Sequence, residues 1–323
     1  MDIRTSPYDA TERETWDEFV AGSNNGTLFH RLDFLDYHPD DRFDEHNLAF
    51  YYKGQNLMGV MPLAIEKQDG NTVARSPYGG SYGGIVHDTD LKFRYMGRMV
   101  AAMVDHLQEM EVDEISIRAS PREQDRTPCS YLEFHLLDHG FDVADTEVTH
   151  VVDLSRFDDD PFDIYEGRCR RAVRKTKDEG IVVDRDPDDI AAFYDLLLET
   201  YDRHGKTPTH TLDELRELRS RFTDRVNLSV ATYDGKVIAG QLGFVLNSRT
   251  YIHMYNCRSD EHKQLNAVNR LIDEEIRWAK KHGLDIFDLG TSVESHTWNA
   301  GLVKFKESFG ATGQFRTRYT KTL

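Results

Sequence analysis

The sequence is poor in cysteine and in long apolar runs, and these absences exclude several classes of protein. Its three cysteines, Cys129, Cys169 and Cys257, are far apart and have neither metal-ligand spacing nor the pattern of a disulfide framework. No window approaches the ~18 consecutive apolar residues of a membrane-spanning helix. The first residues lack the basic start and apolar run of a secretory signal. We therefore expect a cytoplasmic protein with no membrane span.

Positive charge is also scarce. The 323 residues include 57 Asp and Glu against 40 Lys and Arg, a formal net charge of -17. Such a field repels phosphate, which argues against general binding to DNA or anionic membranes. It is typical of proteins from a high-salt cytoplasm, where screening weakens self-repulsion, but an ordinary acidic enzyme has it too. A melting curve against KCl separates these two interpretations.

Familiar catalytic motifs are missing. The chain has no G-x-S-x-G elbow and no H-E-x-x-H helix. Its 14 histidines are scattered, and only His253 and His296 attract notice by position. We therefore expect no metal site.

A faint internal repeat is the main feature that is present. Residues 53–63 and 234–244 align without a gap, with Gly54 matching Gly235 and Gly59 matching Gly240. Each segment predicts a strand, a tight glycine turn and a strand. The elements predicted after each hairpin also match, as a long helix and a short strand: 91–110 and 114–118 in the first half, 265–282 and 285–289 in the second. The sequence thus predicts two similar mixed α/β domains.

The boundary between the two domains is predicted at an acidic run that ends in proline. We expect an N-terminal domain over 1–152, a linker over 153–161 and a C-terminal domain over 162–323. Apolar spacing predicts helices over 188–204 and 212–222 before the second sheet begins near Val226.

A basic island interrupts the acidic chain at residues 168–177, where six of ten residues are Arg or Lys. On a helix Arg168, Arg171 and Arg174 share a face, because residues three or four apart stack. Guanidinium forks suit phosphate, so Arg171 and Arg174 are candidate anion-binding residues. The alternative is a solvated face neutralised by nearby acids.

The segment 76–85 holds four glycines and two tyrosines. Its backbone can approach a ligand closely, which makes Tyr78, Tyr82 and Gly83 candidate substrate-binding residues. The alternative is a glycine-rich turn whose tyrosines pack on the core.

The C-terminal segment predicts a strand over 285–289, a polar loop, a short helix over 301–310 and a final strand over 314–321. Lys304 and Lys306 flank Phe305 and cannot both lie beside it on one helix face. A buried lysine here would stabilise a developing oxyanion. Two solvent lysines on a surface helix are the alternative.

Several of these segments resemble the FemAB-like acyltransferases of the GNAT superfamily. The similar segments are, in chain order, 59–63, 82–85, 171–181, 234–240, 288–290 and 301–310. The last two are similar to the family's closing D-[LF]-G … G-L-x-[RK]-F-K-x-x-F-G pattern. Ordinary GNAT enzymes have a glycine-containing loop for the coenzyme A pyrophosphate, but residues 258–264 contain no glycine.

The resemblance implies an α/β (α+β) fold of two tandem GNAT-like domains, each with a mixed, mostly antiparallel sheet flanked by helices. It implies transfer of an acyl or aminoacyl group, from acyl-CoA or aminoacyl-tRNA, to a small-molecule or peptide amine, with tRNA as a partner in the second case. Phe305 and Lys306 carry over to the transfer centre, with Lys306 steadying the oxyanion. A non-catalytic ligand- or RNA-binding protein on a degenerate transferase scaffold is the alternative.

Overall fold

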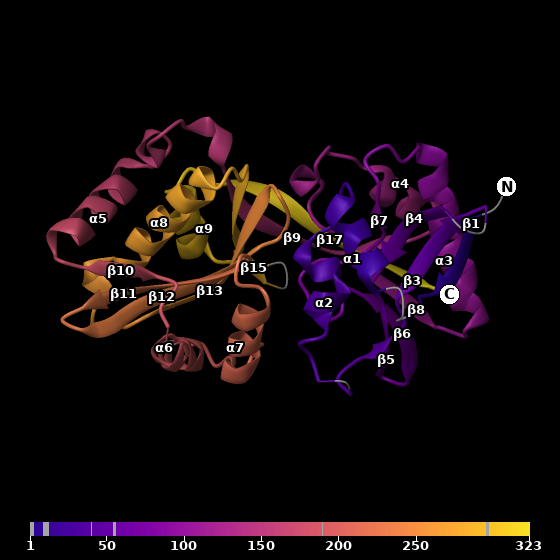
Figure 1. Cartoon of the computed structure of the whole chain (residues 1–323), viewed down its shortest axis with the longest axis horizontal. Coiled ribbons are helices and arrows are strands. Elements are labelled where there is room, and N and C mark those ends of the chain that lie inside the picture. The colour runs from indigo at the N-terminus through magenta and orange to yellow at the C-terminus, as the bar shows by residue number, and fades with distance from the viewer. Residues whose placement is uncertain (1–2, 9–12, 40, 54–55, 189, 295–296) are drawn as a thin grey trace. The chain divides into compact units, whose positions relative to one another are not determined.

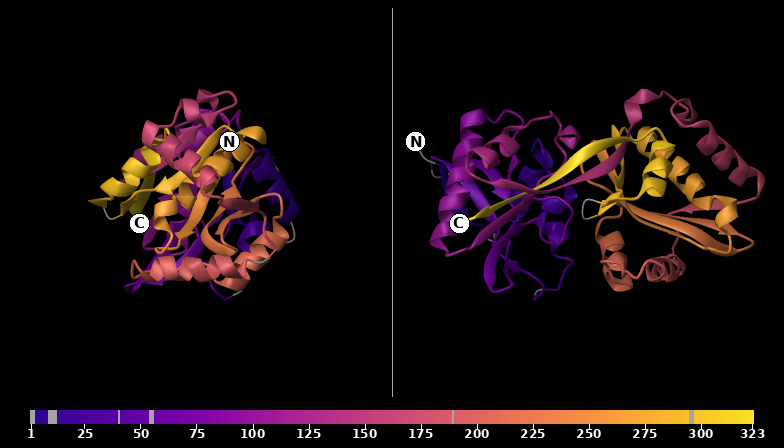
Figure 2. Two further views of the ribbon diagram at one scale, coloured as in Figure 1. Left: turned by 90° about the vertical axis from the view of Figure 1, so that its left-hand side faces the viewer. Right: turned by 180° about the vertical axis from the view of Figure 1, so that it is seen from behind.

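The computed structural model describes the chain except residues 1–2, 9–12, 40, 54–55, 189 and 295–296. The chain forms two compact units, which we call the N-terminal unit (Met1–Glu147 with Gln314–Leu323) and the C-terminal unit (Val148–Gly313). No helix among the described residues is long and apolar enough to span a membrane. Figures 1 and 2 show both units as sheets flanked by helices, which confirms the predicted fold class.

The N-terminal unit contains two sets of paired strands, in the orders β1-β3-β4-β7 and β17-β8-β6-β5-β2. Its strands are β1 (Ile3–Pro7), β2 (Asp44–Glu45), β3 (Leu48–Tyr52), β4 (Asn56–Met61), β5 (Ala64–Gln68), β6 (Asn71–Ser76), β7 (Val86–His87), β8 (Glu114–Arg118) and most of β17 (Thr312–Thr322). Its helices are α1 (Arg13–Gly22), α2 (Leu32–Leu35), α3 (Phe93–Glu109) and α4 (Tyr131–Asp138), with 3-10 turns at Leu28–His30 and Arg122–Gln124. Met96, Val100 and Met103 of α3, spaced three and four residues apart, pack into the core with Ile115 and Ile117 of β8.

The C-terminal unit is built on the strand order β10-β11-β12-β13-β14-β9. Its strands are β10 (Val182–Arg185), β11 (Val226–Tyr233), β12 (Lys236–Val245), β13 (Thr250–Arg258), β14 (Ile286–Thr291), the end of β9 (Asp142–Asp153) and the ribbon of β15 (Val293–Glu294) and β16 (Thr297–Trp298). Its helices are α5 (Gly167–Asp178), α6 (Ala191–Asp202), α7 (Leu212–Arg221), α8 (Ala267–Lys281) and α9 (Ala300–Glu307), with 3-10 turns at Leu154–Arg156, Pro161–Asp163 and Lys263–Leu265. In Figure 1, α5, α8 and α9 lie on one side of this sheet and α6 and α7 on the other.

The predicted helix–strand pairs are present in both units. Helices α3 and α8 lie within the predicted ranges, and β8 has the predicted bounds. The β11–β12 hairpin turns at Asp234 and Gly235, both at positive φ, as a tight two-residue turn requires. Gly54, its counterpart in the first half, lies outside the described residues.

The two units differ from the predicted domains in two places, the final strand and the segment expected as a linker. The last strand was assigned to the C-terminal domain, but residues 318–322 of β17 pair with β8 of the N-terminal unit. The segment 153–161, expected as a linker, belongs to the C-terminal unit, because Leu154 and Phe157 are buried in its core. The acidic composition of that segment is typical of a linker, but its two apolar side chains belong to the core.

Candidate active site

A cavity in the C-terminal unit lies where β13 and β14 separate. The two strands pair in parallel only over residues 250–252 and 286–288, and β13 then continues along β12 to Arg258. The cavity has a volume of ≈ 690 Å³. Residues from β13, the loop after it, the start of α8, α6, β14 and α9 line it, among them His253, Met254, Arg258, Lys263, Asn266, Ala267, Leu289, Leu302, Phe305 and Lys306.

Each of the two diverging strands carries an irregularity beside the cavity. In β13, Tyr255 and His253 pair with the consecutive residues Leu242 and Gly243 of β12, so Met254 is an extra, bulged residue. In β14, the register against β9 shifts between Asp288 and Thr291. Bulges re-aim backbone groups out of the ladder, which is useful at a site where a ligand must meet the backbone.

The Asp-Leu-Gly sequence at 288–290 explains the irregularity in β14. The buried Asp288 carboxylate accepts hydrogen bonds from the Thr149 hydroxyl and, at 2.8 Å, from the Gly290 N–H. Gly290 has φ +76°, a conformation that side chains of L-residues disfavour. The carboxylate and the glycine together turn the end of β14, and they fix where the carbonyls of residues 290 and 291 point.

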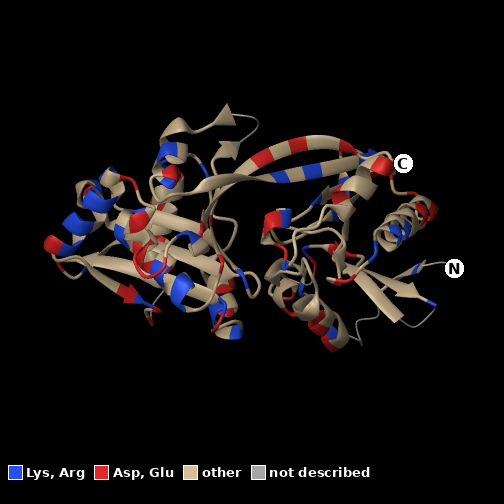
Figure 3. Cartoon of the chain, turned by 90° about the horizontal axis from the view of Figure 1, so that it is seen from above, with Lys and Arg blue, Asp and Glu red and all other residues tan. Residues whose placement is uncertain are grey.

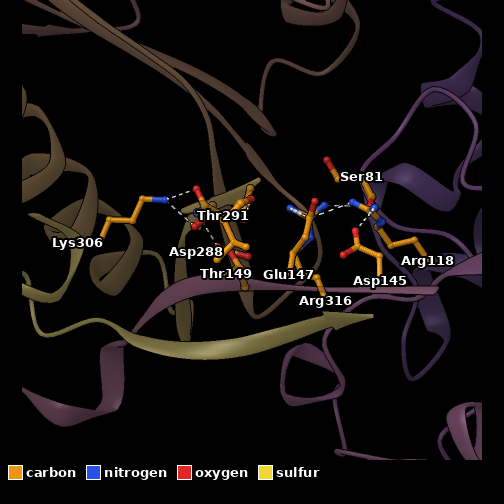
Figure 4. Close-up of polar contacts among 11 residues, drawn as sticks. Ser81, Arg118, Asp145, Glu147, Thr149, Asp288, Thr291, Lys306 and Arg316 are labelled. Carbon is orange, nitrogen blue, oxygen red and sulfur yellow. Dashed lines mark hydrogen bonds and ion pairs between the residues drawn. The ribbon is translucent and has the colours of Figure 1, made fainter. Parts of the chain in front are cut away.

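Lys306 is held by those two carbonyls. Its Nζ donates to the Gly290 oxygen at 2.7 Å and to the Thr291 oxygen at 2.8 Å (Figure 4). The residue is only 5% exposed, although its side chain lines the cavity. A nearly buried ammonium at a cavity wall is suited to stabilise negative charge that develops on a bound ligand.

Lys304 behaves differently, as the helical geometry of α9 requires. Positions i and i+2 of a helix point about 200° apart around its axis, so one lysine faces the cavity and the other faces solvent. Lys304 is exposed, and its backbone carbonyl accepts a hydrogen bond from the Arg168 guanidinium. The alternative of two solvent lysines is therefore wrong. Phe305, between them, lines the cavity and packs edge-on against Phe309, with ring centroids 5.3 Å apart.

Two histidines near Lys306 are kept neutral. Burial and the Lys306 charge lower the pKa of His253 to about 4, and the same causes, in the same order, lower the pKa of His150. The Nε2 of His253 lies 3.0 Å from the Tyr255 carbonyl oxygen. Since that partner can only accept, Nε2 carries the proton and Nδ1 is left as an acceptor. The sequence drew attention to His253 by position alone and missed His150. His296, also noted, lies outside the described residues.

Two cations line the cavity near the start of α8. They are Lys263 and Arg258, and the Arg258 guanidinium pairs with Asp260 at 2.7 Å. Asn266, the residue before the helix, has φ +55°. A helix N-terminus beside two cations favours an anionic group. In the sequence, residues 258–264 lack the glycine of the usual pyrophosphate loop, and their two cations match no known motif.

The basic island forms α5, but its predicted anion-binding residues do not line the cavity. Cys169 and Val173 bury one face of α5 in the core, and Arg171 and Arg174 are exposed. Among the described contacts, the Arg174 guanidinium lies over the Phe162 ring, 5.2 Å from its centroid. Instead, Lys175 of the same helix reaches the loop before α8, where its Nζ lies 3.4 Å from the Gln264 carbonyl oxygen.

The predicted substrate-binding tyrosines are core residues of the N-terminal unit, which corrects the expectation that their side chains contact substrate. Tyr78 is 2% exposed and its hydroxyl donates to Asn47, while Tyr82 is fully buried against Phe29. Gly83 is needed for close packing, because a Cβ there would lie 2.4 Å from the backbone nitrogen of Pro77. The alternative of a glycine-rich turn with packed tyrosines describes this loop.

A family model matches part of the C-terminal unit. Residues 166–300 match the model of the "Acetyltransferase (GNAT) domain" family. No curated protein sequence matches the chain.

Solved structures extend the likeness to the whole chain. A crystal structure of FemX shares 14% identity at a TM-score of 0.74, covering 99% of this chain and 97% of that one. A tandem GNAT protein from the clavulanic acid biosynthesis pathway shares 13% identity at a TM-score of 0.60, covering 99% and 98%. The structure of L-PGS from Bacillus licheniformis shares 13% identity at a TM-score of 0.61, covering 97% and 92%. Residues 166–300 thus match the GNAT acetyltransferase domain model, and the whole chain has a fold similar to FemX and to the tandem GNAT protein.

Proposed function

We propose that this chain is an N-acyltransferase and that the acyl group is transferred in the cavity between β13 and β14. The observation that carries the proposal is the nearly buried Lys306 ammonium at the cavity wall, fixed by two carbonyls of β14. A charged group that was needed only to satisfy those carbonyls would not have to line a cavity.

The proposed reaction is attack of a neutral amine on the carbonyl carbon of a thioester or ester. A C–N bond forms, and the carbonyl oxygen becomes an oxyanion that the Lys306 charge stabilises. The intermediate then collapses, the bond to sulfur or oxygen breaks, and the leaving group takes the proton that the amine releases. His253, neutral at pH 7, offers Nδ1 as an acceptor that orients the amine N–H.

The donor is proposed to place its phosphates at the start of α8. Lys263 and the helix N-terminus supply positive charge there without the usual glycine loop, and Arg258, which pairs with Asp260, adds hydrogen-bond donors. Both acyl-CoA and aminoacyl-tRNA carry phosphates, and they differ in size. The exposed Arg171 and Arg174 would contact only a donor as large as tRNA, so their double alanine variant should weaken aminoacyl-tRNA and leave acyl-CoA unaffected. The acceptor is proposed to be a small-molecule or peptide amine, and the cytoplasmic setting stays a prediction.

The test compares Lys306→Ala with Lys304→Ala. Release of free thiol or of deacylated tRNA is followed with an amine panel, and donor affinity is measured in parallel. We expect Lys306→Ala to lower kcat by about 10²–10³-fold with donor affinity nearly unchanged, as for loss of one oxyanion-stabilising group. Lys304→Ala, on the solvent side of the same helix, should behave as wild type.

Two outcomes contradict the proposal. Equal turnover in both variants would remove Lys306 from the reaction. Tight donor binding with no turnover by the wild-type protein on either donor would favour a non-catalytic binding protein.

A further inference from the structure

A second positively charged site lies in the N-terminal unit, on the face of the β6-β8-β17 strands that the core does not use. Side chains alternate between the two faces of a strand. On one face Ala74, Ile115, Ile117 and Tyr319 belong to the apolar core. The positions between them, Arg75, Arg118 and Arg318, share the other face, since Arg75 pairs with Ser116 and Arg318 pairs with Arg118.

This arrangement concentrates like charges. Arg318 lies directly opposite Arg118, and like charges at opposed strand positions are destabilising. Arg316 is two residues before Arg318 and therefore lies on the same face. Burial, with the charges of Arg316 and Arg318, lowers the pKa of the Arg118 guanidinium. A core-packing role does not account for this crowding.

Neighbouring acids compensate only part of the charge. Arg75 pairs with Glu66 of β5 at 2.8 Å, and two acids of β9 serve Arg118 and Arg316. Arg118 pairs with Glu147 at 3.0 Å and with Asp145 at 3.6 Å, and Arg316 reaches the same Glu147 at only 3.8 Å (Figure 4). Figure 3 shows acidic positions along one long strand and basic positions along the strand beside it. One carboxylate is thus shared by two guanidinium groups.

The arginines surround a pocket of ≈ 320 Å³ that the acids do not line. Its walls are Arg75, Arg118, Arg316 and Arg318, with the hydroxyl-bearing Ser76, Ser81 and Ser116. Arg316 is only 9% exposed, with its guanidinium over the ring of Tyr82. The Nε atoms of Arg316 and Arg318 are buried and have no hydrogen-bond partner among the described residues. Buried donors without partners are costly, so their presence at a pocket wall points to an absent acceptor.

We propose that this pocket binds the phosphate group of a small ligand, as free phosphate or as a phosphomonoester. A planar carboxylate is matched by one guanidinium fork, whereas donors that converge from three strands and a loop need acceptor oxygens in several directions. A tetrahedral phosphate offers them. The site is independent of the proposed transfer reaction, because all of its residues belong to the other unit.

The experiment titrates the full-length protein with inorganic phosphate and, separately, with glycerol phosphate, by calorimetry at an ionic strength held constant with NaCl. Arg318→Gln is compared with Arg94→Gln, which removes an exposed arginine of α3. We expect binding by the wild-type protein and by Arg94→Gln, and affinity at least about tenfold weaker in Arg318→Gln. The tighter of the two ligands identifies the source of the phosphate.

Circular dichroism and melting curves establish that the variants fold. If Arg318→Gln unfolds, Arg318→Lys keeps the charge and removes the fork, and the same loss of affinity is expected. The proposal is overturned if phosphate does not bind, if the Arg318 variants bind it as tightly as Arg94→Gln does, or if acetate binds as tightly as phosphate.

Discussion

The two units repeat one order of elements, yet the strand that follows the long helix ends differently in each. The connectors 110–115 and 281–286 align in sequence, which makes Ile117 of β8 equivalent to Asp288 of β14. Ile117 is buried in the core, and β8 pairs with β17 in unbroken register. Asp288 is equally buried, but its carboxylate supports an irregular strand end that holds Lys306. One change of side chain at an equivalent position separates a structural strand end from a candidate catalytic one.

The strand before the long helix differs as well. In the N-terminal unit β7 pairs antiparallel with β4, as β13 does with β12, but β7 spans two residues and β13 spans nine. The β5–β6 hairpin supplies the parallel partner of β8 instead. The long β13 extends beyond its pairing with β14, and this continuation lines the cavity. Strand length, more than element order, decides which unit holds the cavity.

The largest predicted effect comes from removing the carboxylate that distinguishes the two strand ends. Asp288→Ala leaves the Thr149 hydroxyl and the Gly290 N–H without their buried acceptor, so we expect a loss of about 3–5 kcal/mol in the free energy of unfolding. Urea unfolding measures this. Asp285→Ala, which breaks an exposed pair with Arg249, should cost under about 1 kcal/mol. Equal losses would mean that Asp288 does not support the strand end.

The second prediction concerns buried histidines, one in each unit. Burial lowers the pKa of His30 from 6.5 to about 4, so the folded state resists its protonation. Stability is therefore fully present above pH 6.5 and is lost as the pH falls towards 4, by about 3 kcal/mol for this group. Unfolding measured at several pH values should show a shallower loss for His30→Gln than for the wild type, whereas the exposed His282→Gln should keep the wild-type slope.

His253 sharpens the comparison, because its lowered pKa has an additional cause. The Lys306 charge adds to burial at His253 but has no part at His30. Lys306→Met should raise the pKa of His253 and leave the pKa of His30 unchanged. NMR titration of the two imidazoles measures both values. An unchanged pKa for His253 would contradict the proximity of the two groups.

The next prediction tests the cavity as the donor site. Leu302 lines it and is 37% exposed, so Leu302→Trp fills part of the cavity with little cost to the fold. We expect donor affinity to fall about tenfold, since the added ring occupies ligand space. Leu137→Trp on α4 of the N-terminal unit, at a residue 49% exposed, is the matched control and should bind normally. Equal affinities would place the donor elsewhere.

Much of the fold could be predicted from local patterns. The 3.6-residue apolar period located α3 and α8, because each buries one face on a sheet. The Asp234-Gly235 turn could be predicted from its residue types, since few residues tolerate its positive φ angles. The final strand β17 was readable as a strand, but its partner was not, because pairing with β8 joins residues that are about 200 positions apart in the sequence.

The candidate site was only partly predictable. The spacing of Lys304, Phe305 and Lys306 showed that one lysine must differ from the other, and the family resemblance selected Lys306. Its burial depends on the strand end at Gly290, which no local pattern reveals. The arginines of the second pocket were not predicted, although its Ser76 and Ser81 belong to the segment 76–85. The alternation within β17 places Arg316 and Arg318 at this pocket only because β17 pairs with β8 and β8 pairs with β6.

The smallest predicted effect separates backbone strain from function, using two glycines of the C-terminal unit. Gly290 and Gly283 have φ +76° and +75°, and a Cβ meets nothing closer than 3.6 Å at the first and nothing within 4 Å at the second. Alanine should therefore cost each site about 1 kcal/mol by strain alone, measured by thermal unfolding.

Of these two glycines, only Gly290 has a backbone carbonyl that holds Lys306. A turn relaxed by alanine would move that carbonyl, so Gly290→Ala should also slow transfer by several-fold, while Gly283→Ala transfers at the wild-type rate. If both variants lose stability equally and neither loses activity, the strand end holds Lys306 too loosely to matter, and the contrast between the two units would lie in β13 alone.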